Sequence, residues 1–140
     1  RNRLNRKLRI GIYLFAILSW VGTIGYAAFP LTESGYAGTL QDIVHVFVLT
    51  SAVLILGIAS FLLLIVGGFQ DRKYGSIAII ATVCLCGLVG GTIGMVTAPF
   101  GYGGLMERIS VFSSVGFSFF LGLYVFAGFD WMEKGRPAAD

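Results

Sequence analysis

Four long stretches without a charged side chain constrain what this chain can fold into. They cover residues 10–28, 46–70, 75–98 and 109–129, and tyrosine and cysteine are the only ionisable residues within them. Each reaches or exceeds the roughly 18–20 apolar residues with which a helix crosses about 30 Å of hydrocarbon. Because hydrocarbon offers no partners for backbone N–H and C=O groups, such a segment is expected to be a helix, which bonds these groups internally.

A soluble helical protein is the alternative, and the composition argues against it. Only 12% of the 140 residues are charged, whereas a soluble domain carries about 25%. The four stretches are also apolar on every side, so they lack the polar face of a surface helix. We therefore predict an all-α fold, a transmembrane antiparallel four-helix bundle that forms one membrane domain over residues 1–140. Its helices are expected at about 9–29, 40–69, 75–98 and 106–132.

The basic residues flank these stretches on alternate connections. Five of the ten precede the first stretch, two follow the second, two follow the fourth, and Arg108 alone lies on the opposite side. Because Lys and Arg are enriched in cytoplasmic loops, we expect a multi-pass protein of the cell membrane with both chain ends in the cytoplasm. Anchoring beside anionic headgroups accounts for the net charge of +3, so membrane lipids, and not nucleic acid, are the expected partners.

Small residues recur every fourth position in the last two stretches. Membrane helices gain little hydrophobic energy by leaving lipid, so close approach through small residues matters for their association. Residues four apart share one face of a helix, and we expect the third and fourth helices to pack along such faces. The predicted packing positions are Gly87, Gly90, Gly91 and Gly94 in the third helix and Ser110, Ser114, Ser118 and Gly122 in the fourth.

Three further side chains within the stretches are interpreted as apolar residues that fill space or pack. Cys84 and Cys86 are two residues apart, which places them about 200° apart around a helix. They are expected to be small apolar fillers, and we predict neither a metal nor a cofactor. Trp20 lies near the middle of the first stretch and is interpreted as a packing residue.

Polar residues gather where the expected helices meet the outer membrane surface. Thr39 and Asp42 have the spacing of a capping box, with Asp in place of Glu or Gln. His45, the only histidine, follows Asp42 by three residues, so the two share a helix face. The full cluster predicted on this side is Glu33, Asp42, His45, Glu107 and Arg108. It is interpreted either as a ligand-binding site or as a clamp in which Arg108 pairs with Asp42 or Glu107.

The same region carries a resemblance to a known family. The segment FPLTESGYAGTLQDIVH, which begins at Phe29, and a later glycine-rich loop ending in Glu107 and Arg108 resemble a bacterial and archaeal integral membrane family. This family is catalogued as domain of unknown function nine-nine-eight. The resemblance implies a six-helix protein of which this chain is the last four helices, with two helices upstream of Arg1. Many members carry His-Asp where this chain has Gln41 and Asp42, and no established activity comes with the family.

Three functions are compatible with these features. The first is a non-enzymatic membrane protein that binds a lipid or small amphiphile, or that joins a second copy or another membrane protein through its small-residue faces. The second is a transporter or channel component. The third is a metal-dependent enzyme acting on a lipid or its headgroup, with His45, Asp42 and Glu107 as ligands and a bound water as nucleophile.

Overall fold

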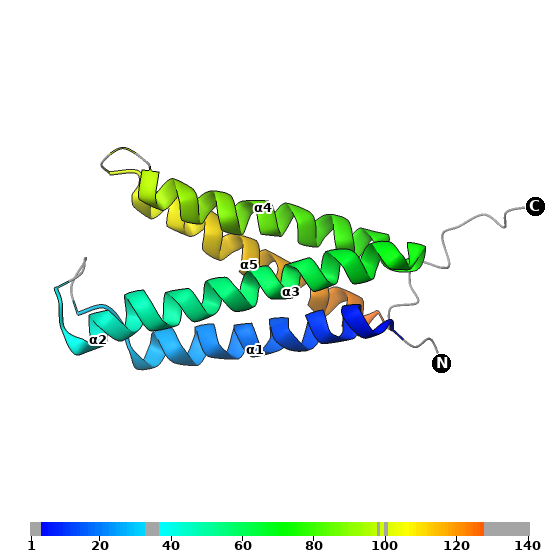
Figure 1. The fold of residues 1–140 in the computed structure, drawn as a ribbon, viewed down its shortest axis with the longest axis horizontal. Helices are drawn as coiled ribbons and strands as arrows, with labels where there is room; N and C mark the ends of the chain where they lie inside the picture. The colour runs from blue at the N-terminus through cyan, green and yellow to red at the C-terminus, as the bar shows by residue number, and fades with distance from the viewer. Residues whose placement is uncertain (1–3, 33–36, 98, 100, 128–140) are drawn as a thin grey trace, which may run out of the picture.

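The computed structural model describes residues 4–32, 37–97, 99 and 101–127, and these residues fold into an all-α bundle (Figure 1). The elements in chain order are α1 (Arg6–Ala28), α2 (Leu40–Ile43), η1 (Val44–Leu49), α3 (Thr50–Gln70), η2 (Arg72–Tyr74), α4 (Gly75–Thr97) and α5 (Gly103–Phe126). The π-helix η1 joins α2 and α3 into one run, and η2 is a 3₁₀ turn. The predicted all-α bundle is confirmed. The fourth long helix begins three residues before the expected position 106, and residues 128–132 lie outside the described part.

Within the described residues, four helical segments are long and apolar enough to cross a membrane. The longest is the run Leu40–Gln70 of 31 residues, which is about 46 Å at 1.5 Å per residue and exceeds the roughly 30 Å of hydrocarbon. The first turns of this run therefore extend beyond the apolar layer, or the run tilts within it. The chain is a multi-pass membrane protein.

Local residue chemistry defines the two ends of α1. The side chain of Asn5 accepts a hydrogen bond from the backbone N–H of Leu8 and so caps the first turn. The Asn5 amide also donates to the carbonyl of Gly67, which ties the start of α1 to the end of α3. At the other end, α1 stops at Ala28, because Phe29 precedes Pro30 and is disfavoured in a helical conformation.

The helices pack in the order α1, α3, α4 and α5 (Figure 1). The first and last of these meet at a cluster of three buried phenylalanines, Phe15 of α1, Phe61 of α3 and Phe117 of α5. Their ring centroids are 4.8 to 5.6 Å apart, within the range of favourable edge-to-face contacts. This cluster is the centre of the core.

Glycines allow the backbones of neighbouring helices to approach closely. A Cβ atom built on Gly67 would lie 2.5 Å from the backbone nitrogen of Leu8, so α1 and α3 touch there. A Cβ atom on Gly91 would lie 2.6 Å from the Met106 carbonyl oxygen and from the Ser110 nitrogen, so α4 and α5 touch there. Ser110 also donates a hydrogen bond of 3.2 Å to the Leu88 carbonyl of α4.

The predicted packing positions divide into two groups. Gly87, Gly91 and Gly94 face α5, where the atoms nearest to an added Cβ belong to Ser113, Ser110 and Met106. Gly90 does not share this face, since an added Cβ would meet nothing within 4 Å. On α5, Ser110 faces α4 and Ser114 is half-buried, whereas Ser118 and Gly122 line an open groove beside α1.

Trp20 is mostly exposed in the described part of the chain, so its interpretation as a packing residue is wrong. Its side chain is 68% exposed, on the side of α1 that also exposes Tyr13, Ile17 and Ile24. An exposed apolar face is stable in hydrocarbon, where lipid tails are as apolar as the side chains themselves. Of the two cysteines, Cys84 is buried and Cys86 is exposed.

Candidate functional site

Asp42 is the fully buried carboxylate of the described residues, and every acceptor position on it is used. Oδ1 accepts from the backbone N–H and the hydroxyl of Thr32, each at 3.0 Å. Oδ2 accepts from the backbone N–H groups of Ala37 at 3.1 Å and Thr39 at 3.2 Å. The Thr39 hydroxyl in turn accepts the Asp42 N–H, which completes the predicted capping box. The capping-box prediction is confirmed.

These hydrogen bonds fasten the α1–α2 connection to the first turn of α2. Thr32 and Ala37 lie on either side of residues 33–36, and one carboxylate holds both. Gly38, with a φ of 80°, supplies the turn that lets Ala37 and Thr39 donate to the same oxygen. Asp42 is therefore a structural anchor whose oxygens have no capacity left for a metal or a substrate.

His45 fastens the end of α1 to η1. Its Nδ1 lies 2.6 Å from the carbonyl oxygen of Phe29, and since a carbonyl can only accept, Nδ1 carries the proton. The imidazole also packs on the Tyr26 ring with 4.7 Å between centroids. Phe29 is the C-cap of α1, so His45 satisfies a carbonyl that the helix itself leaves without a partner. Although Asp42 and His45 are one turn apart, each bonds to a different part of the connection.

Removing the imidazole donor should loosen the end of α1. We expect His45→Phe to lower the free energy of unfolding by about 1 kcal/mol, because the ring contact survives while the Phe29 carbonyl loses its donor. Thermal unfolding in detergent, followed by circular dichroism, measures the change. His45→Asn is the matched variant that keeps a donor and loses the ring. A stability for His45→Phe equal to that of the unmodified protein would contradict this role.

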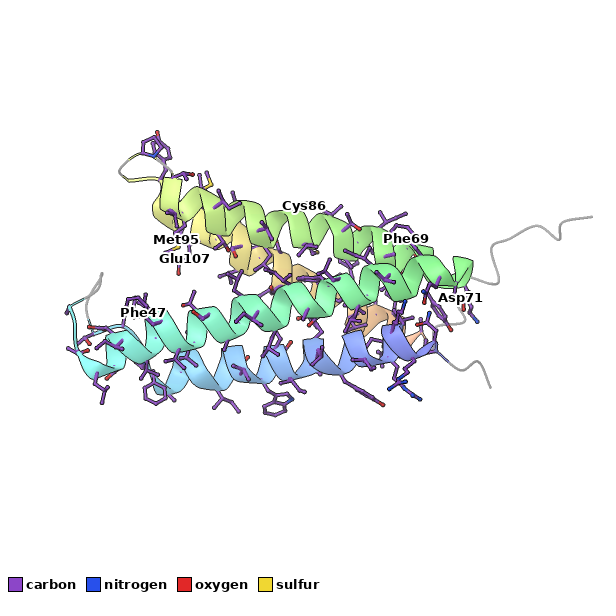
Figure 2. The ribbon with its side chains drawn as sticks, viewed as in Figure 1. Phe47, Phe69, Asp71, Cys86, Met95 and Glu107 are labelled. Carbon is purple, nitrogen blue, oxygen red and sulfur yellow. The ribbon has the colours of Figure 1, made fainter. Side chains whose placement is uncertain are left out.

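The rest of the predicted polar cluster does not converge on Asp42. Glu107 and Arg108 lie in the second turn of α5 and are both exposed, and Glu33 lies outside the described residues. Figure 2 shows Glu107 at the start of α5, on the other helix pair from α2. The clamp between Arg108 and Asp42 is wrong, because Thr32, Ala37 and Thr39 occupy the carboxylate.

The metal-ligand set proposed for the enzyme alternative is also not assembled. Asp42, His45 and Glu107 are all described, and no three His, Cys, Asp or Glu side chains among the described residues lie close enough together to hold a metal ion. Asp42 and His45 both follow the α1–α2 connection closely in sequence. The carboxylate oxygens of Asp42 and the Nδ1 of His45 are already hydrogen-bonded to residues of that connection. Sequence spacing indicated a shared helix face and could not indicate the loop that folds over it.

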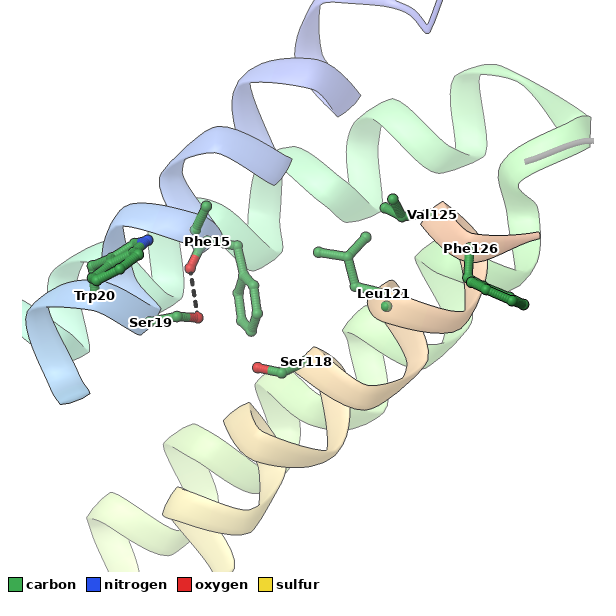
Figure 3. Close-up of a pocket in the computed structure, with 9 residues that line it drawn as sticks. Phe15, Ser19, Trp20, Ser118, Leu121, Val125 and Phe126 are labelled. Carbon is green, nitrogen blue, oxygen red and sulfur yellow. Dashed lines mark hydrogen bonds between the residues drawn. The ribbon is translucent and has the colours of Figure 1, made fainter. Parts of the chain in front are cut away.

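Among the described residues, a groove between α1 and α5 could accept a ligand (Figure 3). Its volume is about 500 Å³, within the usual range for small-molecule sites. It lies beside the contact of α1 and α5 at Phe15 and Phe117, whose ring centroids are 4.8 Å apart. The lining residues are Phe15, Ala16, Ser19 and Trp20 of α1 and Ser118, Leu121, Gly122, Val125 and Phe126 of α5.

The two hydroxyl groups of the groove do not make its surface polar. The Ser19 hydroxyl donates to the carbonyl of Phe15 at 3.0 Å, as Figure 3 shows, and the Ser118 hydroxyl donates to the carbonyl of Ser114 at 3.1 Å. Both donors are thus satisfied within their own helices. The part of the chain that the structure describes places no charged side chain in the lining of the groove. Such a surface can hold an apolar chain without leaving a polar group unpaired.

Two residues of this groove, Ser118 and Gly122, were predicted from the sequence, but as packing positions. The four-residue spacing of Ser118 and Gly122 predicted a smooth helix face, and we expected α4 to cover it. The partner across the groove is α1, which comes about 100 residues earlier in the chain. Small residues at Ala16 and Ser19 were the available signal, since a groove needs small side chains on both walls.

A protein-family model matches most of the chain. The family model described as Protein of unknown function (DUF998) matches residues 1–124. No curated protein and no solved structure matches the chain. The matched range includes the capped α1–α2 connection, the four long helices up to the last turn of α5, and both walls of the groove up to Tyr124. Since the match spans most of its 140 residues, the chain belongs to the DUF998 family.

Proposed function

We propose that this protein is a non-catalytic lipid-binding protein of the cell membrane, and that the groove between α1 and α5 holds a lipid acyl chain. The start of α1 and the end of α5 lie on the cytoplasmic side in this proposal. The basic residues Arg6, Lys7 and Arg9 at the start of α1 support that orientation by the positive-inside rule. The groove is then reached from the lipid around the bundle.

The apolar lining of the groove is the main support for this proposal. An open apolar groove within the membrane-spanning part of a helix bundle is filled by the surrounding medium, because an empty space forfeits the dispersion contacts of its walls. A flexible acyl chain fits an apolar surface whose hydroxyl groups are already bonded. The small residues Ala16 and Gly122 leave room in the groove, and the larger side chains of Trp20 and Phe126 also line it.

Filling the groove tests the proposal. An added Cβ at Gly122 would meet nothing within 4 Å, so Gly122→Leu is expected to fold and to place its side chain in the groove. In liposomes that contain a phosphatidylcholine with a photoreactive group on one acyl chain, we expect labelling of α1 and α5 to fall several-fold. Mass spectrometry of the digested protein locates and quantifies the labelled peptides.

Gly116→Leu is the matched control, because Gly116 also lies on α5 with open space around its Cβ position but does not line the groove. This variant should be labelled like the unmodified protein. Labelling spread evenly over all four long helices, or unchanged in Gly122→Leu, would overturn the proposal. Cross-links between two protein chains through the groove would assign it to helix association instead.

A further inference from the structure

Basic side chains stand at the end of the bundle to which the groove extends. Val125 and Phe126 of the groove form the last turn of α5, and Figure 1 shows this turn at the same end of the bundle as the start of α1. Arg6, Lys7 and Arg9 are exposed in the first turn of α1. Among the described residues, Asp71 is the acidic side chain at this end, and it accepts the backbone N–H of Lys73. The described residues of this end therefore carry a net positive charge.

Only part of this charge lies on the face of α1 that borders the groove. Arg9 precedes Ala16 by seven residues, so the two lie on nearly the same face and about 10 Å apart along the helix. Lys7 is two residues from Arg9, which places it about 160° away around the helix. The face opposite Arg9 packs on α3, as shown by Gly11, whose added Cβ would lie 3.0 Å from the Leu64 backbone.

We infer that the site selects lipids with an anionic headgroup, and that Arg9 binds the headgroup phosphate while the acyl chain lies in the groove. This inference rests on the proposed function, because the groove sets where the lipid lies. A guanidinium group presents several N–H donors in one plane and can bind two phosphate oxygens at once. The apolar groove holds any chain of suitable length, so the choice among lipids depends on the charge at its end.

Competition between two lipids tests the inference. The reporter is labelling of α1 and α5 by the photoreactive phosphatidylcholine, and the competitors are unlabelled phosphatidylglycerol, which is anionic, and phosphatidylcholine, which is zwitterionic. With the full chain, we expect phosphatidylglycerol to compete about fivefold better, the factor expected for one basic residue near an anionic surface. Arg9→Gln should bring the two competitors to equal strength, and Arg9→Lys should retain part of the preference.

Lys7→Gln is the matched control, because it removes the same charge from the same turn on another face of α1. It should keep the preference for phosphatidylglycerol. An equal loss in Lys7→Gln and Arg9→Gln would show diffuse attraction by the basic end and overturn the inference, as would a preference that survives in Arg9→Gln. Groove labelling that persists without lipid preference refutes this inference alone, whereas labelling insensitive to Gly122→Leu refutes the proposed function.

Discussion

Gly91→Ala is expected to lower the free energy of unfolding by about 2–3 kcal/mol, the upper part of the range for overpacking in a close-packed interior. The new Cβ would lie 2.6 Å from the Met106 carbonyl oxygen and from the Ser110 nitrogen, and 2.9 Å from the Ser110 Cβ. Two of these three atoms belong to the α5 backbone, so no side-chain rotation relieves the contact. The helices α4 and α5 must separate, which also weakens the bond from Ser110 to the Leu88 carbonyl.

Unfolding of the purified protein by heat or by sodium dodecyl sulfate in mixed micelles measures this loss. Gly90→Ala is the control, since Gly90 is the neighbouring residue and an added Cβ there meets nothing within 4 Å. This variant should be as stable as the unmodified protein or more stable by up to ~1 kcal/mol, because alanine favours a helix over glycine. Equal destabilisation by the two variants would show that helix propensity, and not the contact with α5, determines the result.

Asp42→Asn should release the α1–α2 connection from α2 at a cost of about 2 kcal/mol, within the range for hydrogen bonds to a charged group. The asparagine amide nitrogen is a donor, so it would face donors of Thr32 or those of Ala37 and Thr39, whichever way the side chain turns. The N–H groups that now donate to the carboxylate would then lack this acceptor. The expected effect is local, because Asp42 lies at the edge of the bundle and outside the phenylalanine core.

Hydrogen–deuterium exchange measured by mass spectrometry checks this expectation. Peptides that contain Thr32, Ala37 and Thr39 should exchange faster in Asp42→Asn, while those from the α4–α5 contact should not change. Gln41→Ala is the control, because the adjacent Gln41 contributes one exposed hydrogen bond to the Pro30 carbonyl. Its effect should be below about 1 kcal/mol. Unchanged exchange in Asp42→Asn would contradict the anchoring role.

Several features follow from local sequence alone. The four uncharged stretches determine the four membrane-spanning helices, because hydrocarbon leaves a long apolar segment no other way to pair its backbone. The spacing of Thr39 and Asp42 predicts the capping box, since both partners lie within one helical turn. The repeat of Gly87 and Gly91 places both on the face of α4 that α5 contacts.

The tertiary structure decided which side chains those local features meet. Asp42 looked like one member of a polar cluster with Glu107 and Arg108, but the connection from α1 folds back and fills its acceptors with Thr32 and Ala37. The face with Ser118 and Gly122 looked like a contact for α4, but α5 crosses α4 so that this face meets α1 across a groove. Periodicity defines which residues share one face of one helix, whereas the angle and partner of that face depend on contacts between segments far apart in the chain.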